Sequence, residues 1–113
     1  MSRTKINIKY NCDFEEAQSI IEKIMDSNGF NKTVINTGEN VWKKGMGLLT
    51  AMQFMKIEFS QEEFSIYAWV QMGLGNFGGG EMDLTGFVAA IPKTALINTI
   101  EQIKNGFQTS TSY

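Results

Sequence analysis

The chain has 113 residues, of which 42% are hydrophobic and 19% are charged, and its net charge at pH 7 is −2. These values are typical of one globular domain and disfavour a disordered chain or a membrane protein. The ten Lys and Arg residues are scattered along an acidic chain. Nucleic acid is therefore not an expected partner, since phosphate binding needs a concentrated basic patch.

The first part of the chain predicts a strand followed by a helix. Residues 5–10 alternate between apolar and polar, which is typical of a half-buried strand. Asp13 and Glu16 have the spacing of a helix capping box, and Asn28-Gly29 is a typical helix end. The apolar stripe of this helix comprises Phe14, Ala17, Ile20, Ile21, Ile24 and Met25.

Four further strands are predicted in the middle of the chain. Residues 32–36 and 41–46 flank a turn at residues 37–40, so they form a hairpin. Residues 52–59 and 64–71 alternate again. Because short turns join these strands, we expect an antiparallel sheet.

The end of the chain predicts a loop and a second helix. Residues 72–86 contain six glycines and no periodicity, which favours a long, flexible loop able to act as a lid. Residues 87–91 are a candidate short last strand, and Pro92 suits the first turn of a helix. The predicted helix stripe is Leu96, Ile97, Ile100, Ile103 and Phe107, and the loop glycines include Gly73, Gly75, Gly78, Gly79 and Gly80.

These elements predict a single α+β domain over residues 1–107 with a frayed polar tail over residues 108–113. The expected fold is one antiparallel sheet of about five strands with two helices on one face, in the order β-α-β-β-β-β-α. This order resembles the single repeat of the TATA-binding-protein-like folds and, less closely, a shortened helix-grip fold. The resemblance implies architecture and no function.

The chain has no histidine and one cysteine, Cys12. Catalysis by Ser-His-Asp or Cys-His and most zinc and iron sites are thereby excluded. We expect a non-catalytic protein without cofactor or metal. The alternative is an enzyme that uses Glu81, Asp83 and a nearby Tyr or Lys, together with a cation, because two acids in a loop suit a divalent ion.

Two short motifs have ordinary explanations. Residues 73–78 match the G-x-G-x-x-G string of dinucleotide sites, but no helix opens inside the motif to meet a pyrophosphate. Lys43-Lys44 is interpreted as a solvated strand end. The sequence shows neither an apolar signal core nor a run long enough to span a membrane, so a cytoplasmic location is expected.

Aromatic residues on one face of the sheet form the main functional hypothesis. If the helices cover the face that includes Met55 and Ile66, the opposite face carries Phe54, Tyr67 and Trp69, and Trp42 can join them. Such a cluster is typical of an association surface. We therefore expect an interaction or assembly domain, a homodimer or a complex with another protein. In the alternative, the glycine-rich loop folds over these rings, as a small second core or as a lid on a small apolar or lipid ligand.

Overall fold

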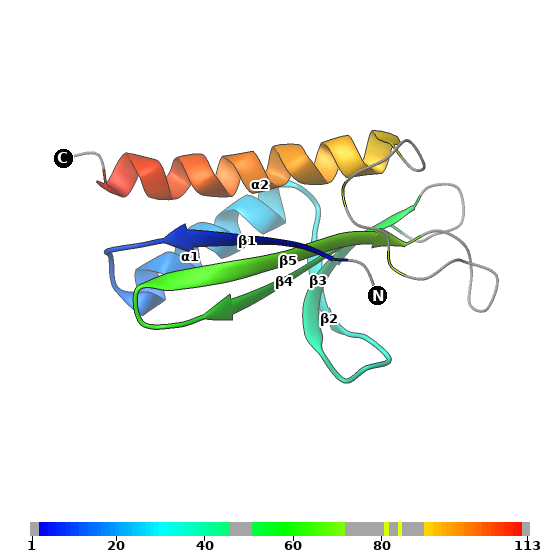
Figure 1. Cartoon of the computed structure of the whole chain (residues 1–113), viewed down its shortest axis with the longest axis horizontal. Coiled ribbons are helices and arrows are strands. Elements are labelled where there is room, and N and C mark those ends of the chain that lie inside the picture. The colour runs from blue at the N-terminus through cyan, green and yellow to red at the C-terminus, as the bar shows by residue number, and fades with distance from the viewer. Residues whose placement is uncertain (1–2, 46–50, 72–80, 82–83, 85–89, 112–113) are drawn as a thin grey trace.

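The computed structural model describes residues 3–45, 51–71, 81, 84 and 90–111, with no side-chain description at 90–91 and 108–111. Figure 1 shows one sheet with both helices on the same side. The sheet is antiparallel and has the strand order β1-β5-β4-β3-β2. The predicted α+β fold and its element order are thus confirmed. The elements are β1 (Thr4–Lys9), α1 (Phe14–Ser27), β2 (Asn31–Val34), β3 (Asn40–Lys44), β4 (Met52–Phe59), β5 (Glu63–Gln71) and α2 (Ala90–Thr111).

The strand order explains the position of α1. Strands β1 and β2 form the two opposite edges of the sheet, so the chain between them must cross the whole face. Four strand spacings amount to about 19 Å, and a helix of 14 residues is about 21 Å long. A helix of this length therefore spans the width of the sheet from β1 to β2 without a long loop.

Helix α1 begins and ends where the sequence predicted, but one predicted capping hydrogen bond is absent. Asp13 is the N-cap residue, and its carbonyl accepts a hydrogen bond from the Ala17 amide at 2.9 Å. Its side chain makes no capping bond, so the predicted capping box is not formed. The helix ends at Asn28, and Gly29 has a φ of +83°, a conformation that glycine adopts without strain.

Helix α2 is longer than its pattern predicted. It begins at Ala90 and continues through Thr111, into the segment expected to be a frayed tail. Residues 87–89 of the predicted last strand lie outside the described residues, and residues 90–91 belong to the helix. Ile97, expected in the buried stripe, is 39% exposed, whereas Thr99 is buried.

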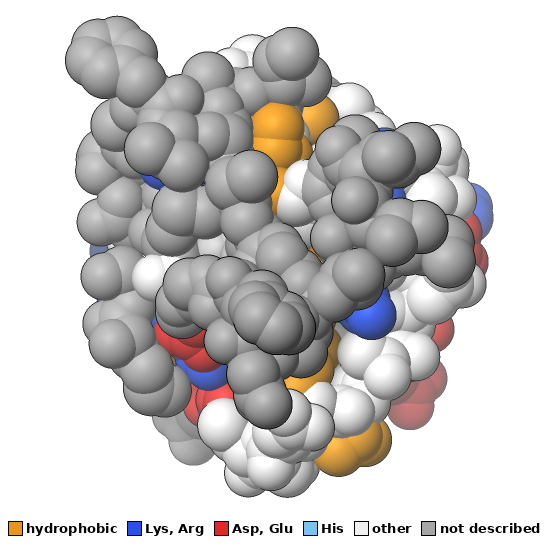
Figure 2. All heavy atoms as spheres, turned by 90° about the vertical axis from the view of Figure 1, so that its right-hand side faces the viewer, with side chains coloured by type: hydrophobic (Ala, Val, Ile, Leu, Met, Phe, Trp, Pro, Cys, Tyr) orange, Lys and Arg blue, Asp and Glu red, His pale blue; other side chains and the backbone are white. Residues whose placement is uncertain are grey.

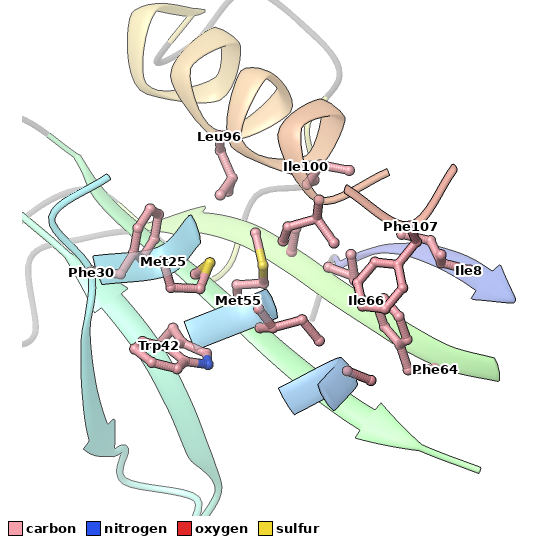
Figure 3. Packing of buried hydrophobic residues seen from close by; sticks show 14 of the residues in the cluster. Ile8, Met25, Phe30, Trp42, Met55, Phe64, Ile66, Leu96, Ile100 and Phe107 are labelled. Carbon is pink, nitrogen blue, oxygen red and sulfur yellow. The ribbon is translucent and has the colours of Figure 1, made fainter. Parts of the chain in front are cut away.

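The main core lies between the two helices and one face of the sheet (Figure 3). Alternate residues of β1, β4 and β5 supply the sheet side, as the sequence predicted. Gly106 of α2 faces Ile20 and Ile24 of α1, where an added Cβ would lie 3.3 Å from the Ile20 side chain. The small residue thus permits the two helices to approach closely. Within the described part of the chain, no helix has the length and apolar character needed to cross a bilayer.

Candidate functional site

Phe54, Tyr67 and Trp69 lie on the sheet face away from the helices. Phe54 and Trp69 are cross-strand partners on β4 and β5, and their rings stack at 5.3 Å between centroids with an interplanar angle of 11°. Both side chains are nevertheless buried, since Phe54 is 5% exposed and Trp69 is 1% exposed. The open face of the sheet therefore carries a second small core, which we call the open-face cluster (Val41, Phe54 and Trp69).

Arg3 lies against this cluster. Its guanidinium carbon is 3.8 Å from the centroid of the Trp69 ring, a cation–π distance. The same group donates two hydrogen bonds to Glu39, both at 2.9 Å, and two to Glu81, at 2.8 and 2.7 Å. Bidentate pairs of this kind fix a guanidinium in orientation as well as in position. Figure 2 shows acidic and basic side chains gathered at this end of the molecule.

The charged network extends from Arg3 along the sheet. Glu39, in the β2–β3 turn region, also accepts hydrogen bonds from Thr37 at 2.6 Å and from Lys56 at 2.8 Å. The hydrogen bonds from Arg3, and then those from Lys56, hold the pKa of Glu39 far below its usual range. Hydrogen bonds to Glu81 and Glu39 raise the pKa of Arg3. Arg3, Glu39 and Lys56 thus stabilise one another in their charged forms, which is a structural role.

Trp42 lies on the opposite face from the one predicted. It is the cross-strand partner of Met55, whose side chain packs under the helices, so Trp42 belongs to the main core (Figure 3). Its neighbour Val41 occupies the open face instead. The prediction that Trp42 joins Phe54 and Trp69 is therefore wrong, because the β3–β4 register differs by one residue from the one it required.

The remaining predicted groups do not assemble into a catalytic or metal site in the described residues. Glu81 is bound to Arg3, and Asp83 lies outside the described residues. Among the described side chains, no cluster of three or more potential metal ligands occurs. Burial, and then the charge of Glu16, raise the pKa of the Cys12 thiol. The predicted loop glycines Gly73, Gly75, Gly78, Gly79 and Gly80 also lie outside the described residues.

A cleft of about 660 Å³ lies between α1 and strands β2, β3 and β4, and we call it the α1 cleft. Figure 1 shows the β2–β3 hairpin projecting from the sheet beside α1. The cleft has an apolar floor and a rim in which most side chains are polar. The floor comprises Ile21, Trp42, Ile57 and Phe59, with Val41 also lining the cleft, and the rim comprises Gln18, Glu22, Lys32, Thr33, Asn40 and the exposed apolar residue Val34.

An ion pair crosses the rim of the α1 cleft. The Lys32 ammonium on β2 lies 3.1 Å from a Glu22 carboxylate oxygen on α1. It also lies 5.1 Å from the centroid of the Trp42 ring. Both side chains are largely accessible, with 64% of Lys32 and 46% of Glu22 exposed. The pair contributes little to stability as a result, because water screens exposed charges.

The apolar floor continues past the end of the cleft. The Phe59 ring meets the Phe14 ring edge to face, with 4.9 Å between centroids. Phe14 is 49% exposed, although its place in the helix pattern predicted a core position. Phe14 and Ile21 lie on the same side of α1 with the polar Gln18 between them, so the apolar surface beyond the cleft consists of the Phe14 and Phe59 rings.

Sequence reasoning missed the α1 cleft for a physical reason. Glu22 and Lys32 are 10 residues apart and belong to different elements, and Trp42 reaches them only through the register of β3. The available signal was the cross-strand pair of Lys32 with Trp42 in a correctly registered hairpin. Comparison with known proteins adds no assignment, because no family model, no curated protein and no solved structure matches this chain.

Proposed function

We propose that this protein is a non-catalytic binding module that holds a small amphipathic molecule in the α1 cleft. The observation that carries the proposal is a concave site of about 660 Å³ with an apolar floor and a polar rim. Ligand sites commonly have volumes of about 300–1,000 Å³, apolar walls and a few convergent polar groups. Trp42 and Phe59 supply aromatic surface, which contributes strongly to the binding of small apolar groups.

The α1 cleft supports this function better than the open face supports assembly. An interface built on Phe54 and Trp69 would first require Arg3 to leave two carboxylates. The α1 cleft requires only that the exposed Lys32 side chain leaves its one ion pair with Glu22, and Ile57 and Phe59 of its floor are already partly exposed. Preformed sites cost less free energy to occupy.

A steric block in the cleft tests the proposal. Gln18→Trp places a large ring among the lining residues, and Ser19→Trp is its matched control, because Ser19 is exposed and the next residue on α1 does not share the same face. A library of amphipathic small molecules is screened against the wild type by ligand-observed NMR. We expect bound compounds to be lost with Gln18→Trp and retained with Ser19→Trp.

The opposite pattern would overturn the assignment of the site. If every bound compound binds Gln18→Trp as well as the wild type, the α1 cleft is not the binding site. A thermal unfolding curve for each variant ensures that a lost signal reflects a filled cleft and not an unfolded protein.

A further inference from the structure

We propose that the α1 cleft selects an organic cation with an apolar body, and that Lys32 occupies the cation position while the ligand is absent. This inference rests on the proposed function and names the ligand class for the same site. Its basis is the position of the Lys32 ammonium, 3.1 Å from a Glu22 oxygen and 5.1 Å from the Trp42 ring centroid. A carboxylate beside an aromatic face is the arrangement with which proteins bind ammonium groups.

The charges around the position favour a cation over an anion. Glu22 and Lys32 are the charged side chains that line the cleft. When Lys32 turns away, an incoming group meets the Glu22 carboxylate and the electron-rich face of Trp42, and both attract positive charge. An anion bound to Lys32 would lie beside that carboxylate and against that ring face, and both repel it.

Lys32 can leave this position at small cost. It lies on β2, an edge strand, and 64% of its side chain is exposed, so the ammonium stays hydrated when it moves out. The backbone of β2 does not need to move, because the long side chain alone makes both contacts. Lys32 is thus a mobile substitute for a ligand and not a fixed wall of the cleft.

The apolar floor defines the rest of the ligand. Trp42 pairs with Met55, and Phe59 is four residues further along β4, which corresponds to about 13 Å along the strand. Ile57 lies between them on the same face, and Phe14 extends the surface beyond Phe59. A ligand with an ammonium at Trp42 and an alkyl or aryl body along Ile57 and Phe59 fits this surface.

Three amphiphiles with the same tail test the inference: decyltrimethylammonium, decyl sulfate and decyl maltoside, each below its micelle concentration. Binding is measured by NMR titration, in which the indole N–H signals of Trp42 and Trp69 are resolved and assigned with Trp42→Phe. We expect the cation to bind most tightly and to shift the Trp42 signal, with Trp69 unchanged.

Two substitutions should change the affinity in opposite directions. Lys32→Gln removes the competing ammonium, so decyltrimethylammonium should bind about threefold to thirtyfold more tightly. Glu22→Gln removes the carboxylate and should weaken binding by a similar factor. Lys23→Gln and Glu15→Gln are matched controls, since both residues are exposed on α1 outside the cleft and change the net charge equally.

The outcomes separate this inference from the proposed function. Tighter binding of decyl sulfate, weakened by Lys32→Gln, would overturn it and make Lys32 an anchor for anions. Equal binding of all three amphiphiles would also overturn the inference. So would a result in which decyltrimethylammonium binds neither the wild type nor Lys32→Gln. The proposed function would stand in each case if the compounds that do bind are blocked by Gln18→Trp and not by Ser19→Trp.

Discussion

Replacing Arg3 with alanine should destabilise the domain by about 3 kcal/mol. Arg3 makes four charge-assisted hydrogen bonds, and its side chain is 13% exposed. Removing one partner of a buried ion pair costs about 3–5 kcal/mol, whereas an exposed pair is worth about 0.2–1 kcal/mol. The Arg3 site lies between these limits, and its stacking on Trp69 adds about 1 kcal/mol.

The assay is urea and thermal unfolding in a Trp42→Phe background, where tryptophan fluorescence reports Trp69 alone. At about 4 °C per kcal/mol, Tm should fall by about 12 °C. The emission of Trp69 should shift to the red, since Arg3 no longer shields a ring that is 1% exposed. Arg3→Lys keeps the charge but cannot make the bidentate pairs, so its loss should be intermediate.

A loss below about 1 kcal/mol for Arg3→Ala, with unchanged Trp69 emission, would refute this reasoning. It would mean that the network acts as an ordinary surface ion pair. Equal losses for Arg3→Ala and Arg3→Lys would show instead that the geometry of the guanidinium, and not its charge, stabilises the fold.

Three further predictions concern pH, a buried amide and self-association. The pKa of Glu39 is lowered in the folded protein. The stabilisation that Glu39 supplies is therefore complete above the ordinary carboxyl pKa and is lost as pH falls. The urea midpoint of the wild type should decline below about pH 5, and Glu39→Gln should make that decline smaller. If the urea midpoints of the wild type and Glu39→Gln decline equally with falling pH, other carboxylates cause the decline. Gln53 is 8% exposed and its Oε1 atom has no hydrogen-bond partner among the described residues. Gln53→Met should therefore be neutral or stabilising by up to about 1 kcal/mol in urea unfolding. A loss of stability of that size would contradict this account. If the protein self-associates through the open face, Arg3→Ala, which uncovers Trp69, should sediment as a larger species than the wild type at equal concentration. If both proteins sediment as monomers, the open face is not an interface.

The sequence alone determined the elements and their order because each depends on local chemistry. Alternation predicted β4 at the same residues that form it, and Asn28-Gly29 predicted the end of α1. The period of two also set Phe54 opposite Met55 on β4 and Trp69 opposite Ala68 on β5, and assigning the more apolar side of each strand to the core put the two rings on the other face. These predictions required no knowledge of distant contacts.

The tertiary structure decided which side chains are buried and which residues they contact. Arg3 is 36 residues from Glu39 and 78 residues from Glu81, so no local pattern indicates that these side chains cover the aromatic face. The face of Trp42 depended on a register that a slip of one residue reverses. The α1 cleft exists because α1 crosses the sheet from one edge to the other and brings Glu22 beside Lys32, and only the packing of the helix on the sheet sets that distance.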